Sequence, residues 1–170
     1  MGKNRNILLL SDSHGHPARI RQAVERTQPD CLLFAGDGLR DIEEAQLSPS
    51  LPVYAVRGNS DALWLGCGAH CPEEQIVTLD GVRILLTHGH MLGVKGGLER
   101  AISHAAAAQA DVLVFGHTHG VFECTVSPGG TEGPTRALLV CNPGSVGLYP
   151  HSFGTLTLHD GQILFGYGTL

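Results

Sequence analysis

The sequence has little charge and few aromatic side chains. Only 16% of its 170 residues are charged, Lys and Arg together number 11, and there is a single Trp. Because the basic residues are scattered and few rings are present to stack on bases, we expect no nucleic-acid groove. The 42% of hydrophobic residues is typical of an ordinary globular protein, and the length predicts a single domain over residues 1–170.

Long apolar runs and cysteine pairs are also missing. Before Asp12 the apolar run covers only residues 7–10, which is too short for a signal peptide or a membrane helix, so we expect a cytoplasmic protein without membrane contact. The five Cys are an odd number, and Cys31 and Cys141 lie in apolar runs where Cys acts as a small hydrophobe. The spacing in Cys67-Gly68-Ala69-His70-Cys71 could hold a metal, but no second Cys/His pair accompanies it, so free thiols in a loop are favoured.

What the sequence does contain is five short segments with metal-ligand side chains, each at the end of an expected strand. In order they are Asp12-Ser13-His14, Gly36-Asp37, Gly58-Asn59, His88-Gly89-His90 and Gly116-His117-Thr118-His119. They supply two Asp, one Asn and at least four His without a thiolate, which suits divalent metals in hydrolytic sites better than structural zinc. Asp and Asn beside Gly are common in turns, but five such motifs together favour a metallohydrolase.

The apolar pattern predicts an α/β protein that begins with a βαβαβ unit. Strands are expected over residues 6–11, 31–35 and 53–56, and helices from His16-Pro17 to Pro29 and over 39–47. Parallel strands joined in this way place their following loops at one edge of the sheet. In the second half, the expected elements are a hairpin around Asp80-Gly81, a helix over 97–109, a strand over 112–115, a hairpin tip over 127–134 and a last hairpin at Asp160-Gly161.

Local geometry predicts how the ligands converge. In an extended loop alternate residues point to the same side, so Asp12 should converge with His14, and His117 with His119. Gly36 lets the backbone turn sharply before the next carboxylate, so that this carboxylate can sit between two metals.

The motif set resembles the calcineurin-like metallophosphoesterase superfamily, whose pattern is D-x-H, G-D, G-N, H and G-H-x-H. More narrowly it is similar to the small cap-less prokaryotic phosphodiesterases, because the chain is short and contains Thr87-His88-Gly89-His90 and Asn142-Pro143-Gly144-Ser145. The resemblance covers residues 12–145. It implies a four-layer α/β/β/α sandwich of two mixed sheets flanked by helices, and a phosphodiesterase that hydrolyses small phosphate diesters.

The resemblance also implies seven metal ligands. They are Asp12, His14 and His119 for the first metal, Asn59, His88 and His117 for the second, and Asp37 as the bridge between them. The cofactors would be two divalent ions, with Mn as the first expectation and Ni, Fe, Co or Zn as alternatives. Such ions can share a bridging hydroxide that attacks phosphorus in line.

The chain departs from the family pattern where the acid for the leaving group is usually found. Many members continue the Gly-Asn segment with His, whereas here Ser60 stands in that place. The Asp that often supports that His is matched by Arg40, with Asp41 one place late. His90 is the best substitute as the catalytic acid, since it lies two residues from His88, but a role in orienting a ligand or capping the loop is equally open.

Other polar residues near the motifs have plainer interpretations. Asp61 is interpreted as a hydrogen-bond acceptor behind the ligands, because a carboxylate beside two cations stays ionised. Arg57 and Lys95 could each meet a phosphate, but single basic residues near Gly are more often solvated. The histidines outside the motifs, interpreted as surface or satisfied core residues, are His16, His70, His104, His151 and His159.

Two other functions stay open at this stage. The first is a phosphomonoesterase or nucleotidase on the same site, which the missing acid disfavours. The second is a non-catalytic scaffold domain, of which the retromer subunit of this fold is an example, although that relative lacks several ligands that this chain retains. The expected partner is a small phosphate-ester substrate whose identity stays open, as do the native metal and homo-oligomerisation.

Overall fold

The computed structural model describes residues 4–63, 70–130 and 133–170. Along the chain the elements are β1 (Arg5–Leu10), α1 (Pro17–Thr27), β2 (Cys31–Phe34), α2 (Leu39–Glu44), β3 (Val53–Ala55), the 3₁₀ turn η1 (Ser60–Leu63), β4 (Glu74–Leu79), β5 (Val82–Thr87), the 3₁₀ turn η3 (His90–Leu92), α3 (Glu99–Ala107), β6 (Val112–Val114), β7 (Val121–Val126), β8 (Leu138–Pro143), β9 (Ser152–His159) and β10 (Gln162–Thr169). Among these residues no helix combines the length and apolarity needed to cross a membrane.

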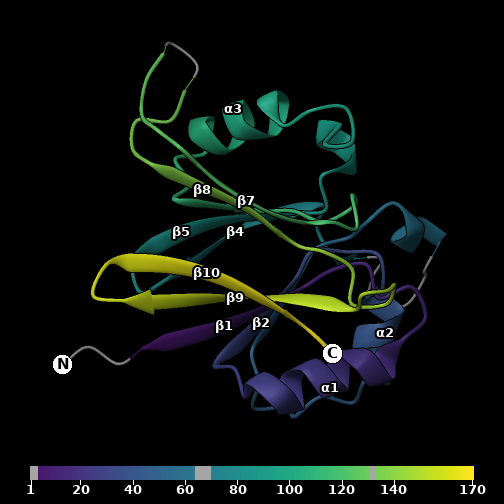
Figure 1. Ribbon diagram of the computed structural model, residues 1–170. Helices are drawn as coiled ribbons and strands as arrows, with labels where there is room; N and C mark the ends of the chain where they lie inside the picture. Colours follow the sequence, from purple (N-terminus) through teal and green to yellow (C-terminus); the bar gives the residue numbers. More distant parts are fainter. Residues whose placement is uncertain (1–3, 64–69, 131–132) are drawn as a thin grey trace.

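The strands form two five-stranded sheets, in the orders β10-β9-β1-β2-β3 and β4-β5-β6-β8-β7. In the first sheet β1, β2 and β3 are parallel, as the βαβαβ pattern predicted, while β9 and β10 are antiparallel. In the second sheet β5, β6 and β8 are parallel, and β4 and β7 lie antiparallel at the edges. The sheets face each other, with α1 and α2 outside the first and α3 outside the second (Figure 1). The expected four-layer α/β/β/α sandwich is therefore confirmed.

Burial on both faces of the central strands explains why their sequences are continuously apolar. In β1, Ile7 and Leu9 belong to the apolar cluster between the sheets, while Leu8 and Leu10 pack toward α1 and α2. A third apolar cluster fills the space beneath α3. Alternate residues of one strand thus serve two different layers, which removes the polar–apolar alternation of a half-exposed strand.

The hairpins expected at Asp80-Gly81 and at Asp160-Gly161 form as their turn residues predicted. Asp80 and Gly81 have φ of 49° and 82°, and Asp160 and Gly161 have φ of 46° and 80°. Positive φ at both central residues gives the turn twist that matches two antiparallel strands. The helix α2 ends earlier than expected, because Gln46 adopts a left-handed φ of 51° and stops the helical path.

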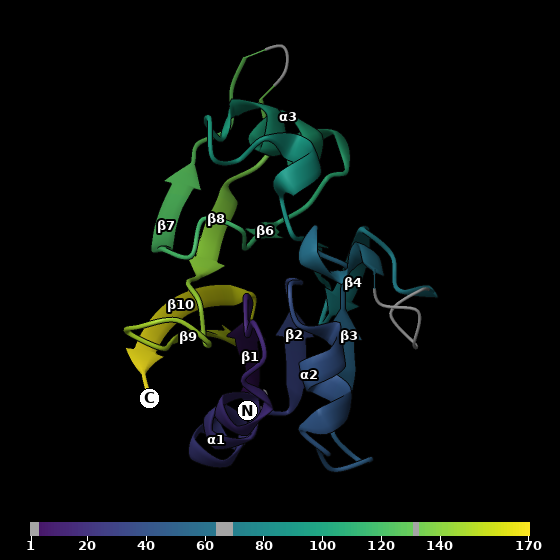
Figure 2. The same cartoon turned by 90° about the vertical axis from the view of Figure 1, so that its right-hand side faces the viewer.

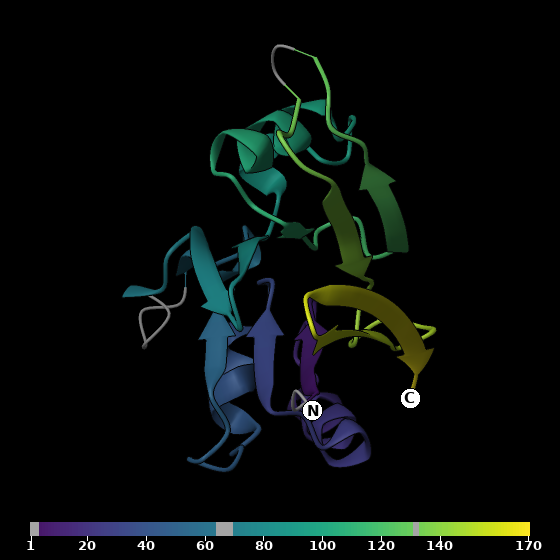
Figure 3. The same ribbon diagram turned by 90° about the vertical axis from the view of Figure 1, so that its left-hand side faces the viewer.

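The ends of the sandwich differ in content. The loops that follow β1, β2, β3, β5 and β6 lie at the end that faces the viewer in Figure 2. The opposite end, which faces the viewer in Figure 3, contains the start of β1 and the turn between β9 and β10. At that end the guanidinium of Arg5 makes a two-point ion pair with Asp80, at 2.8 and 2.9 Å, and so joins the first sheet to the second.

The cysteines behave as expected where they are described. Cys31 and Cys141 are buried in strands, and four cysteines are free thiols. The thiol of Cys71 donates to the carbonyl oxygen of Ala55 at 3.0 Å. Cys67, Gly68 and Ala69 lie outside the described residues, and with them the alternative metal spacing.

Candidate metal centre

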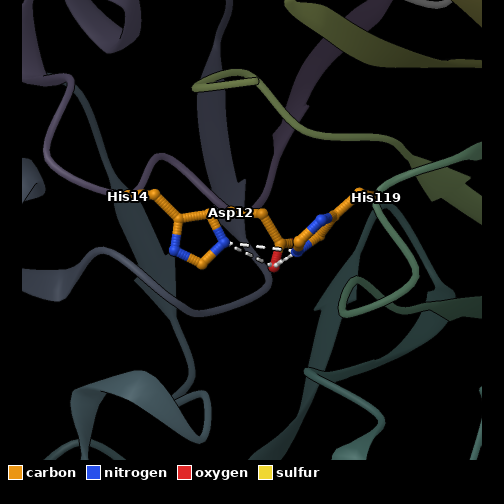
Figure 4. A group of neighbouring side chains, drawn as sticks. All are labelled: Asp12, His14 and His119. Carbon is orange, nitrogen blue, oxygen red and sulfur yellow. Dashed lines mark hydrogen bonds and ion pairs between the residues drawn. The ribbon is translucent and has the colours of Figure 1, made fainter. Parts of the chain in front are cut away.

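Three side chains from the first and last motifs meet where β1 ends. The Oδ1 atom of Asp12 lies 3.5 Å from Nε2 of His14 and 3.2 Å from Nε2 of His119, and the two nitrogens are 3.2 Å apart (Figure 4). These distances put all three atoms about 1.9 Å from their common centre, close to the roughly 2.0–2.2 Å at which nitrogen and oxygen ligands bind zinc. The three donors therefore fit one divalent ion.

The two oxygens of Asp12 have different surroundings. Oδ2 accepts hydrogen bonds from the hydroxyl of Ser11 at 2.5 Å and from the N–H of His117 at 3.0 Å. Oδ1 is buried and accepts no hydrogen bond within the described parts of the chain. A buried carboxylate oxygen without a partner is unfavourable, and a cation at this position would remove that cost.

A second group of donors overlaps the first and contains Asp12, Asp37 and His88. The fully buried His88 lies with Nδ1 2.7 Å from the carbonyl oxygen of Ala35, so Nδ1 carries the proton and donates it there. Its Nε2 lies 3.2 Å from Oδ1 of Asn59 and 3.4 Å from Oδ2 of Asp37. Fixing the proton on one ring nitrogen leaves the other for a metal.

His117 lies beside this second group. Its ring centroid is 5.0 Å from that of His88, whereas His119 belongs to the first group. Five of the seven expected ligands belong to the two groups. The other two, His117 and Asn59, lie next to His88. One feature missed by sequence reasoning is that Asp12 belongs to both groups, whereas Asp37 belongs to the second.

Charge and burial set the protonation of these groups. Burial raises the pKa of Asp37, but the contact with His88 and the hydrogen bonds from Ser60 outweigh it and hold that pKa well below its usual range. Burial lowers the pKa of His88, while the contact with Asp37 and the charge of Asp12 raise it, with a net increase. Burial, and then the charges of His88 and Lys95, lower the pKa of His117 to about 4. Asp37 ionised and His117 neutral are the forms that bind metal.

The prediction of extended ligand loops is wrong. Positive φ occurs at five of the expected ligands, with 55° at Asp12, 44° at His14, 60° at Asp37, 66° at His117 and 61° at His119. Asp12 and His14 still converge, but through left-handed backbone, whereas His117 lies beside His88 and His119 joins Asp12 and His14. Asp and His tolerate this region better than most residues, and each instance still costs on the order of 1–3 kcal/mol. Such conformations persist only where the surroundings hold them.

Two glycines are required by close approach at the centre. A Cβ on Gly58 would collide with the carboxylate of Asp37. A Cβ on Gly36, whose φ is 93°, would lie 2.7 Å from the backbone nitrogen of Gly58 and 2.9 Å from Nδ1 of His88. Gly36 therefore provides the sharp turn that the sequence predicted, and also leaves space for the neighbouring motifs.

Two buried carboxylates hold the ligand loops in place. Asp61 accepts the backbone N–H groups of Asp37, Gly38, Leu39 and Gly58 at 2.8–3.0 Å, so its interpretation as an acceptor is confirmed. Asp41 accepts the hydroxyl of Ser13 at 2.5 Å and the N–H of Gly15 at 2.8 Å. Asp41 thus holds the first ligand loop in place, and it does not support a catalytic acid.

Ser60 has a contact that sequence reasoning missed. Its N–H and hydroxyl donate to the two carboxylate oxygens of Asp37, at 2.8 and 3.0 Å. A residue that begins a helical turn directly after a ligand segment has its N–H free to donate, which is the signal that was available.

His90 lies next to the second group. Its ring centroid is 5.3 Å from that of His88 and 6.1 Å from that of His117, and its buried Nδ1 makes no hydrogen bond within the described residues. Burial, and then the charge of His88, lower its pKa. Arg57 is not simply solvated, because it pairs with Glu73 at 2.8 Å.

The remaining histidines mostly match their surface interpretation. His16 contacts a backbone carbonyl, and His104 and His159 lie near the carboxylates of Glu74 and Asp160. His70 is exposed. His151 is different, because its Nδ1 is buried without a hydrogen-bond partner among the described residues.

Known proteins resemble this chain along most of its length. The family model of the calcineurin-like phosphoesterase superfamily domain matches residues 6–161. Probable metallophosphoesterase YsnB of Bacillus subtilis is 32% identical over 160 residues, covering 91% of this chain and 85% of YsnB. Phosphodiesterase MJ0936 of Methanocaldococcus jannaschii is 29% identical over 175 residues, covering 91% of this chain and 92% of MJ0936. The crystal structure of a conserved protein of Streptococcus pneumoniae, described as a predicted phosphoesterase, matches with a TM-score of 0.73 at 22% identity, over 99% of this chain and 91% of that one.

Proposed function

This chain belongs to the calcineurin-like phosphoesterase superfamily, and from that premise we propose that it hydrolyses small phosphate diesters with two divalent metal ions. It is a metal-dependent phosphoester hydrolase, in keeping with relatives named metallophosphoesterase and phosphodiesterase. The family implies divalent ions and a small-molecule substrate. The proposal adds the number of ions, their ligands, their identity as Mn and the preference for diesters.

The observation that carries the proposal is the overlap of two donor groups at Asp12, whose buried Oδ1 accepts no hydrogen bond within the described residues. The proposed ligands are Asp12, His14 and His119 for one ion, Asn59, His88 and His117 for the other, and Asp37 between them. Oxygen and imidazole donors without thiolate suit Mn, Fe, Co, Ni or Zn, and Mn is the ion we propose. When bound, two such ions would supply an activated water for attack on phosphorus and would neutralise the charge that develops on the phosphoryl oxygens.

The protein's own groups fix where this chemistry takes place. Ser60 orients both carboxylate oxygens of Asp37, and the Nδ1–H bond of His88 to Ala35 directs its Nε2 toward Asn59 and Asp37. In our proposal His90 donates a proton to the leaving oxygen, because it lies beside the second group and its Nδ1 is free of other hydrogen bonds in the described structure.

The preference for diesters is supported by the name of the relative MJ0936 and by Ser60. Serine is not an acid at neutral pH, so this chain lacks the proton donor that many family members have at that position. A phosphomonoesterase on the same site is the alternative.

The test combines metal content with a choice of substrate. Protein incubated with Mn should contain about two ions per chain, as the seven proposed ligands imply. It should also hydrolyse bis-(p-nitrophenyl) phosphate with a higher kcat/KM than p-nitrophenyl phosphate, and chelation should abolish the activity. Asp37→Ala should lose both ions, and Asp160→Asn, at the opposite end of the sandwich, should retain them.

Three outcomes would change the proposal. No more than trace metal after incubation with Mn would reject the two-ion site. Faster hydrolysis of the monoester than of every diester would replace the proposal with a phosphomonoesterase. Two bound ions without any hydrolysis would support a scaffold domain.

A further inference from the structure

Asn142 is a buried polar side chain at the end of β8 that the proposed chemistry does not use. Its amide nitrogen donates to the carbonyl oxygen of Gly116 at 2.9 Å and to the hydroxyl of Thr118 at 3.0 Å. Its amide oxygen accepts the N–H of Gly144 at 2.8 Å. The orientation of the amide is unambiguous, since a backbone N–H can only donate and a carbonyl oxygen can only accept. Three of its four hydrogen-bonding positions are filled, and two lie on the segment that carries His117.

The segment held by Asn142 is a γ-turn. The N–H of Thr118 donates to the carbonyl oxygen of Gly116 at 2.7 Å, and His117 between them has a φ of 66°. A hydrogen bond across two residues with a positive φ at the centre is the rare, strained form of this turn. Asn142 donates to the first and the third residue of the turn, so it holds together the two ends that would separate if the strain were released.

The other contacts of the turn come from proposed ligand residues themselves. The N–H of His117 donates to Asp12, and the N–H of Gly116 donates to the carbonyl oxygen of His88. Asn142 differs from these residues, because it holds the turn without being a proposed ligand. A substitution at Asn142 therefore changes the orientation of His117 without removing any proposed ligand.

We propose that Asn142 is a positioning residue that keeps His117 in the conformation needed to bind the second metal ion. This inference rests on the proposed function, in which His117 is a ligand of that ion. Residues that orient metal ligands by hydrogen bonding typically contribute about 10–100-fold to metal affinity. The same loss is expected here for one ion and not for the other.

The experiment compares matched variants in a cobalt(II) titration followed by visible absorption and calorimetry. Asn142→Asp keeps the size and the acceptor for Gly144 but removes both donors, and should weaken the binding of one ion about 10–100-fold. Thr118→Val removes one hydroxyl at constant shape and should act in the same direction. Thr118→Ser keeps the hydroxyl and should bind both ions as the wild type does. Leu139→Ala creates a cavity beside the same strand, away from the hydrogen bonds of Asn142. It should lower the melting temperature without changing the affinity for either ion.

The outcomes separate this inference from the proposed function. Wild-type affinity for both ions in folded Asn142→Asp overturns it, as does an equal loss for both ions or the same loss in Leu139→Ala. If Asn142→Asp does not fold, equal cobalt affinities in Thr118→Val and Thr118→Ser overturn it. His117→Ala reports on the ligand assignment. If that variant keeps both ions, the assignment fails and the inference fails with it. If it loses one ion while Asn142→Asp and Thr118→Val keep both, only the inference fails.

Discussion

Asp61 offers the sharpest test of how the ligand loops are held. Its carboxylate is 6% exposed and accepts four backbone N–H groups. Oδ2 receives those of Asp37 and Gly58, and Oδ1 receives those of Gly38 and Leu39. In Asp61→Asn one oxygen becomes an NH₂ group, which cannot accept a hydrogen bond. Whichever way the amide turns, two backbone donors lose their acceptor.

The size of the effect follows from these two donors. A buried donor without an acceptor costs about 1–3 kcal/mol, so Asp61→Asn should lower the free energy of unfolding by about 2–6 kcal/mol. That is a large part of the roughly 5–15 kcal/mol that stabilises a typical domain. Urea unfolding in the presence of chelator measures the loss without any contribution from bound metal.

Asp160→Asn is the matched control for this measurement. Its carboxylate is 65% exposed and lies 3.5 Å from His159, so its replacement should change the free energy of unfolding by less than about 0.5 kcal/mol. A loss below about 1 kcal/mol in Asp61→Asn would refute the reasoning, because a single unsatisfied donor is expected to cost at least that much.

Three further perturbations test the centre. Gly58→Ala should weaken metal binding by at least about tenfold, because the added Cβ would displace the carboxylate of Asp37. The control Gly120→Ala should not weaken it, since no atom lies within 4 Å of the added Cβ. Calorimetry with Mn compares the two variants. His90→Ala should slow diesters with poor leaving groups by about 10²–10⁴-fold and spare nitrophenyl diesters in a kcat/KM series, and an equal loss for all substrates together with lost metal would make His90 a residue that orients a ligand. Free Mn at about 100 times its dissociation constant should raise the free energy of unfolding by about 2.7 kcal/mol for each site, as a shift of the urea midpoint that Asp37→Ala should not show.

The fold could be predicted to the extent that its signals are local. The apolar run of β1 and the Asp80-Gly81 turn form as expected, because burial on both faces and hairpin twist act over a few neighbouring residues. The left-handed backbone at Asp12 and His14 could not be predicted, since it depends on hydrogen bonds from distant segments: the N–H groups of these two residues donate to the carbonyl oxygens of Gly36 and Asp37.

The candidate site followed from motifs, but its supporting contacts did not. The donation from Ser60 to Asp37 arises only when the loops after β2 and β3 pack together. The membership of Asp12 in both donor groups likewise depends on the second sheet bringing His88 beside the first. Pattern reasoning supplies the identity of the donors, and tertiary packing decides which of them share a group.

The two ends of the sandwich are joined in different ways. At one end the Arg5–Asp80 ion pair links the sheets without a metal ion. At the other end each proposed ion draws donors from both sheets, since Asp12 and His14 follow β1 while His119 follows β6, and Asn59 follows β3 while His88 follows β5. Bound metal would therefore hold the two sheets together at the end opposite the Arg5–Asp80 pair. Removing the ions should let the sheets separate only at the end that carries the proposed ligands. Amide hydrogen exchange should then become faster in the ligand loops of both sheets and stay slow beside Arg5.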